Sequence, residues 1–313
     1  MTHDSIQPRI LLVTPEISLV PDCSGENSAC LCCKSGGFAG FLSYWGGDLY
    51  MRGVDVHITQ PDYRSVFVYI LRNKPRLKEC RLPPSHVHLA EDRAFFYAGQ
   101  SRSNSVRENI KISLAFQREV INQILPLIKP DLIHCHDWMC GLIPAVARKL
   151  GIPCIFTIQS CETVKCLLSD VEDTGIDAAG FWQQLFFDRF PLNYEETRQT
   201  NAVDFLLSGI FAARHVSIAS PALLVKIAES FIRSPEAPLV RVLSEKLAVD
   251  CNTTTDVGSD RMQYVDLYER LLRRPVLKIG VKKSKIRSEF PRHLNRLILS
   301  QKLKIGDTRY AHG

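Results

Sequence analysis

The chain has 313 residues, of which 45% are hydrophobic and 23% are charged, fractions that are ordinary for a folded globular protein. This length accommodates one large domain or two smaller ones. The formal net charge is +6, no apolar run is long enough to cross a membrane, and the N-terminus lacks the features of a signal peptide. We therefore expect a cytoplasmic protein with no membrane partner.

The N-terminal part predicts one strand–helix–strand unit. Arg9 to Thr14 is a nearly continuous apolar run, typical of a buried parallel strand. A long loop from Pro15 to Ser35 leads to a helical pattern from Phe41 to Met51, and Asp55 to Gln60 reads as a second strand. Strands joined by a crossover helix are expected to lie parallel in one sheet. Residues 61–104 are expected to be irregular.

The middle of the chain continues this alternation. Ser105 to Ile128 carries a helical apolar face, and a short apolar strand ends at His134. A helical pattern from Leu142 to Leu150 separates it from the next strand, which ends at Thr157.

Beyond a loop to Gly175, the alternation persists to residue 231. The pattern predicts helices over 181–187 and 203–211, a strand over 215–217 and a helix over 222–231. The fold class is therefore α/β, a doubly wound and mostly parallel sheet with helices on both faces.

Polar side chains follow the strands that end at His134 and Thr157. His136 and Asp137 come after the first of these strands, and Gln159 comes after the second. Ligands of open α/β sheets bind beyond the carboxyl ends of the strands. His134, His136 and Asp137 are thus expected where a ligand would lie.

A glycine-bearing loop, Lys34-Ser35-Gly36-Gly37, precedes the first predicted helix. Glycines let a backbone approach a phosphate, a helix N-terminus offers amide donors, and a lysine adds a positive charge. The pattern is neither a Walker motif nor a dinucleotide fingerprint. The alternative is a glycine loop with an incidental lysine.

The cysteines and the basic C-terminus leave alternatives open. Four of the eleven cysteines crowd residues 23–33, but no second pair follows as a zinc site prefers, so we favour free thiols and expect no metal. Cys135, Cys140 and Cys154 fit small core residues. Residues 276–313 are rich in Lys and Arg; a solvated tail is favoured over nucleic-acid binding, because no aromatic stacking pattern accompanies the charge.

Ordered motifs along residues 9–250 resemble one family, the bacterial glycogen synthases and starch synthases. The motifs are Leu11–Glu16, Lys34–Gly37, Gly53–Val56, Pro61–Arg64, Ile112–Ile124, Pro130–Ala145, Gly151–Ile158, Gly175–Ala179, Asn193–Glu196 and Ser220-Pro221. The family consists of retaining glucosyltransferases that transfer glucose from ADP-glucose to an α-1,4-glucan. The resemblance implies the GT-B fold, in which two Rossmann-like domains enclose the site, with no cofactor.

The resemblance also assigns roles to individual positions. Lys34 corresponds to the lysine that meets the phosphates of the donor, with Gly36 and Gly37 beside it. Asp137 corresponds to the aspartate near the donor glucose and the acceptor, and His136 is a further substrate-binding candidate. The chain departs from the family pattern at Gln159, where the family has a histidine that contacts the glucosyl unit, and at Gly40, where the family has an aspartate.

The resemblance fades near residue 250 and resumes in a segment similar to the family's closing helix. It implies a catalytic N-terminal domain over 1–250, a linker over 251–261 in place of the second domain, the closing helix over 262–275 and a basic tail over 276–313. Half a cleft lacks the cations that stabilise a leaving diphosphate. We therefore expect weak binding of ADP-glucose or ADP, with α-glucan as a second ligand, and little or no activity by this chain alone.

Two alternatives to a weakly active enzyme follow from the same motifs. One is a non-catalytic partner of a full-length synthase or of another glucan enzyme, which it would meet through the exposed cleft face. The other is a decayed relic without a selected function.

Overall fold

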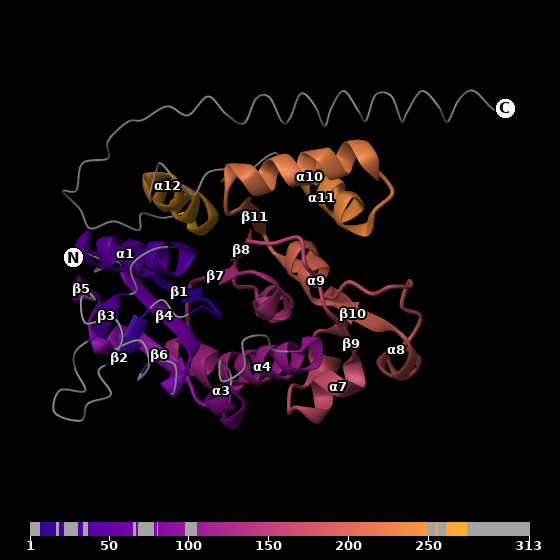
Figure 1. Cartoon of the computed structure of the whole chain (residues 1–313), viewed down its shortest axis with the longest axis horizontal. Helices are drawn as coiled ribbons and strands as arrows, with labels where there is room; N and C mark the ends of the chain where they lie inside the picture. Colours follow the sequence, from indigo (N-terminus) through magenta and orange to yellow (C-terminus); the bar gives the residue numbers. More distant parts are fainter. Residues whose placement is uncertain are drawn as a thin grey trace, which may run out of the picture.

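The computed structural model describes residues 7–16, 19–21, 31–33, 37–64, 67, 78–79, 81–97, 105–249, 254–255 and 261–273. Its centre is a seven-stranded sheet in which all neighbouring strands run parallel (Figure 1). In spatial order the strands are β12 (Thr254–Thr255), β11 (His215–Ile218), β8 (Cys154–Ile158), β7 (Leu132–His136), β1 (Arg9–Val13), β4 (Asp55–Pro61) and β6 (Val87–Ala90).

The strand order confirms the doubly wound topology. From β1 the chain winds outward through β4 to β6, and it then returns to β7 on the other side of β1 and winds outward again through β8 and β11. Every residue of β7 and β8 is buried, as expected for strands covered on both faces. The winding direction changes between β1 and β7, and such switch points are where ligands bind in this class of sheet.

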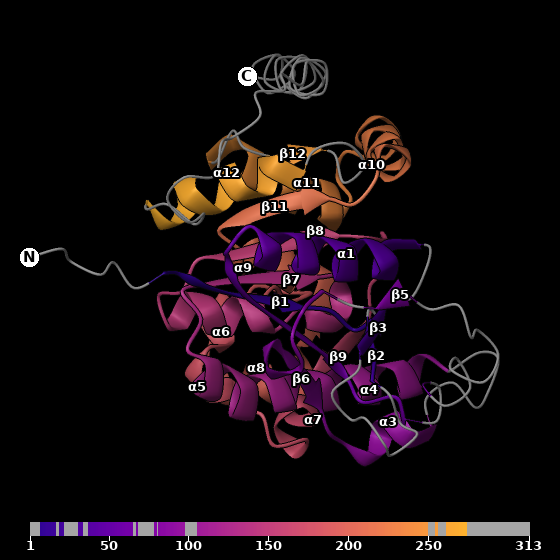
Figure 2. The ribbon, with the colours of Figure 1, turned by 90° about the vertical axis from the view of Figure 1, so that its left-hand side faces the viewer.

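One face of the sheet is covered by two helices from opposite ends of the chain. They are α1 (Gly37–Met51) and α12 (Arg261–Leu272), which Figure 2 shows in front of the strands, with α12 higher than α1. Trp45 of α1 packs against Tyr264 and Tyr268 of α12, with ring centroids 4.9 and 6.0 Å apart. These rings belong to one apolar cluster, which also contains Ile10 of β1, Leu132 of β7, and Val56 and Ile58 of β4.

The other face carries the larger apolar cluster. Its helical segments are α4 (Val106–Glu119), the π-helical η2 (Val120–Ile124), α5 (Leu125–Ile128), α6 (Ile143–Lys149), α9 (Phe205–Ala212), α10 (Pro221–Arg233) and α11 (Pro238–Val249). The helix predicted from residue 105 is confirmed. It starts at a capping box, in which the Glu108 amide donates to Ser105 Oγ at 3.2 Å and the Ser105 amide donates to the Glu108 carboxylate at 2.6 Å.

Short elements complete the described part of the chain. Two antiparallel sheets consist of β2 (Leu19–Pro21), β3 (Leu31–Cys33) and β5 (Lys78–Glu79), and of β9 (Lys165–Leu167) and β10 (Ala202–Asp204). The remaining helical segments are η1 (Pro84–His86), α3 (Arg93–Tyr97), η3 (Trp138–Cys140), α7 (Leu168–Asp173), η4 (Ala178–Gly180), η5 (Trp182–Gln184) and α8 (Tyr194–Thr200).

Four local expectations were wrong. The region 61–104 contains strand β6 and helix α3, and the expected loop from Pro15 to Ser35 contains β2 and β3. All these elements have five residues or fewer, which is too short for a period to be recognised. The helix expected over 181–187 is instead the single 3₁₀ turn η5, after which Phe187 bridges with Val203. The loop expected up to Gly175 contains strand β9 and the six-residue helix α7.

The C-terminal expectations fall partly outside the described residues. The helix expected from Met262 to Leu272 is present as α12, and β12 lies within the stretch expected to be a linker. The basic tail beyond Arg273 lies outside the described residues. Within the described part of the chain, no helix combines the length and apolar character needed to span a bilayer.

Candidate functional site

A strained turn follows β7 at the switch point of the sheet. Asp137 has φ 65° and ψ 173°, a region that side chains other than glycine rarely adopt. Its amide donates to the Thr157 carbonyl at 2.9 Å, and its own carbonyl accepts from the Cys140 amide at 3.0 Å. A Cβ on Gly141 would lie 2.0 Å from the Phe205 carbonyl oxygen, so only glycine lets η3 approach α9 this closely. These contacts hold the turn in its conformation.

The Asp137 carboxylate lies against the end of β8. Its Oδ1 is 3.4 Å from the amides of Gln159 and Ser160, and Ser160 Oγ lies 3.4 Å from both carboxylate oxygens. Burial raises the pKa of Asp137 to about 6, although hydrogen bonds from neighbouring backbone amides partly oppose this rise. A carboxylate with a pKa near neutrality is able both to accept and to give up a proton at working pH.

The side chain of Gln159 is the second group of interest. Its amide nitrogen is buried and makes no hydrogen bond to the residues that the structure describes. Because buried amide groups are nearly always hydrogen-bonded in folded proteins, this donor is available to a ligand. The sequence predicted that Asp137 and Gln159 follow strands at one edge, and the structure brings them together.

His136 and His134 lie beneath that edge. Both are fully buried, and their rings stack with centroids 4.4 Å apart. Burial lowers the pKa of His136 to about 3, so its ring is uncharged at neutral pH. A ligand at the sheet edge meets Asp137 before it meets His136.

His134 is a core residue, contrary to the expectation that it would meet a ligand. Its Nδ1 lies 2.8 Å from the Tyr268 hydroxyl and its Nε2 lies 2.7 Å from Thr157 Oγ1, which in turn lies 2.6 Å from Ser217 Oγ. This buried chain joins α12, β7, β8 and β11. Polar residues at matching positions of adjacent strands could have indicated it, since Thr157 and Ser217 are register partners.

The remaining predicted residues are only partly described. Lys34 and Gly36 lie outside the described residues. Gly37 is the first residue of α1, and the β1–α1–β4 crossover starts that helix on the carboxyl side of the sheet. Of the cysteines expected in the core, Cys135, Cys140 and Cys154 are all buried.

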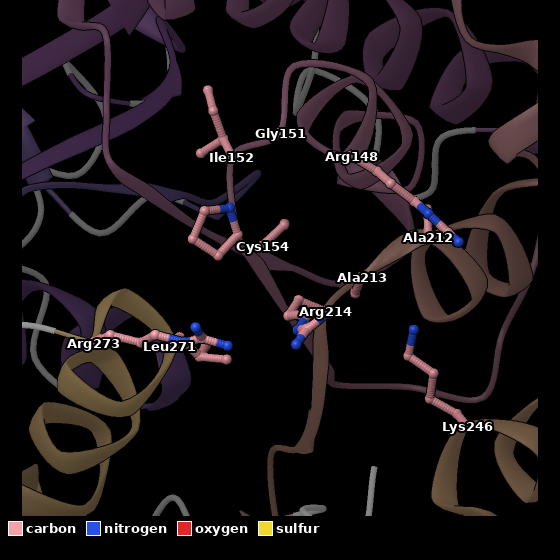
Figure 3. A pocket seen from close by; sticks show the side chains of 11 residues that line it. Arg148, Gly151, Ile152, Cys154, Ala212, Ala213, Arg214, Lys246, Leu271 and Arg273 are labelled. Atoms are coloured by element: carbon pink, nitrogen blue, oxygen red, sulfur yellow. The ribbon is translucent and has the colours of Figure 1, made fainter. Parts of the chain in front are cut away.

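A cavity of about 430 Å³ lies at the opposite, amino edge of the sheet. Figure 3 shows the side chains of Arg148, Arg214, Lys246 and Arg273 around it. The Arg148 guanidinium lies over the Phe211 ring, 5.8 Å from its centroid, and Lys246 Nζ donates to the Phe211 carbonyl at 3.2 Å. The described residues that line the cavity include arginines and a lysine and no acidic side chain, so its charge favours an anion. It is separate from the Asp137 site, because Cys154 and Gln159 stand at opposite ends of β8.

Among the described residues, one group has metal-ligand spacing: Asp55, His57 and His86. It also lies at the amino edge of the sheet, where β4 begins and β6 is about to begin.

Comparison with known proteins identifies relatives of the chain. Residues 9–239 match the family described as the starch synthase catalytic domain. A glycogen synthase of Desulfitobacterium hafniense is 23% identical over 214 residues, which cover 60% of this chain and 44% of that protein. Glycogen synthase 1 of Rhizobium meliloti is 24% identical over 209 residues, which cover 60% of this chain and 42% of that protein. The chain thus spans less than half the length of these two curated relatives.

A solved structure supports the same relationship at the level of the fold. The catalytic domain of starch synthase IV from Arabidopsis thaliana, bound to ADP and acarbose, superimposes with a TM-score of 0.50 and 16% identity over 77% of this chain and 50% of that chain. The doubly wound sheet with its switch point between β1 and β7 is therefore the Rossmann-like half of a GT-B fold. The family match covers most of the chain, and the chain belongs to the family of the starch synthase catalytic domain.

Proposed function

We propose that the carboxyl edge around Asp137 binds a nucleotide sugar, ADP-glucose, together with the end of an α-glucan. The observation that carries the proposal is the Asp137 turn, which is strained, buried and located at the switch point of the sheet. Strain of this kind persists where function uses it. The buried amide of Gln159 adds a donor suited to a sugar hydroxyl.

We infer that this chain transfers glucose slowly or not at all when it acts alone. A diphosphate leaving group needs cations that are fixed in place before the reaction. The described contacts of Asp137 are instead to the uncharged residues Gln159 and Ser160. Gln159 also stands where the resemblance implies a histidine, and an amide cannot titrate as an imidazole does.

The domain division is part of the same proposal. We infer that residues 1–250 form the N-terminal catalytic half, that 251–261 replace a second Rossmann-like domain, that 262–275 close onto the first half and that 276–313 form a basic tail. The packing of α12 on α1 and the hydrogen bond between Tyr268 and His134 support this division.

The test is an assay of glucan extension by the purified chain, with ADP-glucose as donor and glycogen as acceptor. We expect extension to be absent or far slower than that of a full-length synthase assayed in parallel. Any residual extension should disappear in Asp137→Asn and persist in the matched control Arg214→Gln, which alters the opposite edge. Residual extension that survives Asp137→Asn would contradict the proposed site, and rapid extension abolished by that change would contradict only the inferred weakness.

A second candidate function is that of a non-catalytic partner of a full-length synthase. Two large apolar side chains on one loop favour it, because Phe190 and Leu192 are 88% and 76% exposed, and exposed apolar groups of this kind mark interaction surfaces. Size-exclusion chromatography of the chain mixed with a synthase should then show a complex, and Phe190→Ser should weaken it. Separate elution of the two proteins would exclude this function.

A further inference from the structure

Three histidines and one aspartate meet at the amino edge of the sheet, far along the strands from Asp137. Asp55 and His57 lie two residues apart on β4, so their side chains point to the same face. His86 ends η1, and His88 lies on β6, the parallel neighbour of β4. The register of these two strands, in which Ile58 pairs with Val87, is what brings residues so distant in sequence together.

The ligand atoms of this cluster converge on one point. Asp55 Oδ1 lies 3.1 Å from His57 Nε2 and 3.8 Å from His86 Nδ1, and all three atoms lie within 4.8 Å of one another. The two imidazole rings stack with centroids 4.5 Å apart. Ligand atoms around a tetrahedral zinc ion are about 3.3 Å apart, as follows from bond lengths near 2 Å. The atoms of the cluster have about this spacing, and the two rings would have to turn out of their stacked arrangement so that both lone pairs face one ion.

The groups behind these ligands are arranged as partners in an outer shell. Arg9 Nε donates to Asp55 Oδ2 at 3.0 Å. Asp55 Oδ1 is hydrogen-bonded to His57 Nε2 at 3.1 Å, and an ion bound to both atoms would replace this bond. His57 Nδ1 lies 2.9 Å from His88 Nε2. With an ion on Nε2, His57 would carry its proton on Nδ1 and donate it to His88, the arrangement that fixes the tautomer in most histidine metal sites. His86 would exchange its 3.0 Å bond with the Val56 carbonyl for the ion.

We propose that Asp55, His57 and His86 bind one divalent transition-metal ion from solution, with Zn²⁺ as the ion that best fits them. Two imidazoles and one carboxylate are ligands that zinc shares with other borderline metals. The side chains of Asp55, His57 and His86 are 24%, 13% and 20% exposed, so an ion has access and water can take the fourth position. The ion would join β4 to the segment that leads into β6, and so stabilise this edge of the sheet.

The test is calorimetric titration of Zn²⁺ into the full chain, stripped with a chelator and with its accessible thiols alkylated to remove competing ligands. We expect one ion to bind per chain and the melting temperature to rise with Zn²⁺, because the ion binds only the folded state. NMR of the histidine ring nitrogens should show shifts at His57 and His86 on addition of Zn²⁺. A chain that takes up no Zn²⁺ would overturn the proposal and leave a purely hydrogen-bonded histidine cluster.

Variants locate the ion. His86 lies outside the sheet strands, so its replacement should disturb the fold little. Loss of an outer partner costs roughly 10- to 100-fold in metal affinity, so we expect a loss of Zn²⁺ affinity in this range for His88→Ala and a larger loss for His86→Ala. His215→Ala, on β11 and separated from β4 by three strands, is the matched control and should bind normally. Circular dichroism checks that each variant is folded. Unchanged affinity in folded His86→Ala and Asp55→Asn would place the ion elsewhere and overturn the assignment.

Discussion

Asp137 combines two costs at one residue, an unfavourable backbone conformation and a desolvated carboxylate. The positive φ of this residue costs on the order of 1–3 kcal/mol. Burial of the carboxylate acts in addition, because it raises the pKa of Asp137 to about 6 from the ordinary 3.8. Substitutions that relieve such costs stabilise a protein and reduce its activity when the site needs the strained group.

The change Asp137→Asn should therefore stabilise the fold at neutral pH. The folded pKa lies above the unfolded one, so the carboxylate destabilises the folded state fully above about pH 6 and no longer does so below about pH 4. We expect the free energy of unfolding to rise by about 1–3 kcal/mol at pH 7.5 and the gain to vanish near pH 4. Urea unfolding at both pH values measures it. An equal gain at both would show that the ionised carboxylate is not its cause.

At the scale of elements, the sequence predicted long helices with a periodic apolar face and strands that are continuous apolar runs. The helix from residue 105 and strand β8 follow from such patterns. Strand β6 could not be predicted, because it has only four residues and lies at the edge of the sheet. Such a short segment shows no clear alternation of apolar and polar residues. The approach of Asp137 to Gln159 could be predicted, because parallel strands end at one edge of a sheet. For His134, the matching polar residues Thr157 and Ser217 could have indicated the buried hydrogen bonds within the sheet. Its contact with Tyr268 could not be predicted, because α12 is distant in sequence.

The contact of α12 with the sheet depends on a buried hydrogen bond. Tyr268 is fully buried, and its hydroxyl lies 2.8 Å from His134 Nδ1. Tyr268→Phe keeps the ring but leaves that nitrogen without its partner, which should cost about 1–3 kcal/mol of the free energy of unfolding. Tyr50→Phe is the control, because it removes the same hydroxyl from a tyrosine whose described contact is that of its ring with His86. Urea unfolding of both variants tests this, and equal losses would mean that the His134 bond contributes nothing specific.

The contact of η3 with α9 depends on Gly141. A Cβ at this position would meet the Phe205 carbonyl at 2.0 Å, so Gly141→Ala should push η3 away from α9 and disturb the adjacent Asp137 turn. We expect a loss of the free energy of unfolding larger than the roughly 1 kcal/mol of an average point mutation. Gly151→Ala is the control. It introduces backbone strain, because Gly151 has a φ of +72°, but no steric clash, because a Cβ there meets nothing within 4 Å. Thermal unfolding that ranks Gly151→Ala as the worse variant would contradict this account of η3.

At the scale of the whole molecule, two places differ in what they offer to an anion. The amino-edge cavity presents arginines and a lysine, whereas the described residues of the carboxyl edge present a carboxylate and uncharged groups around it. A nucleotide diphosphate is attracted to the first by charge alone. The function proposed above instead assigns the nucleotide to the second, where α1 begins at Gly37. The position at which ADP binds therefore separates general electrostatic attraction from an inherited site.

We expect ADP to bind at the carboxyl edge, with a dissociation constant in the millimolar range, or about −4 kcal/mol, because few phosphate contacts are available there. Amide shifts in an NMR titration should cluster at residues 37–42 and 137–141, and added salt should weaken binding. Arg214→Gln, in the cavity, should leave the affinity unchanged. Shifts that instead surround Arg148 and Arg214, and disappear in Arg214→Gln, would assign the nucleotide to the cavity. In that case the turn at Asp137 would still have its strained backbone conformation, but the nucleotide would not bind beside it.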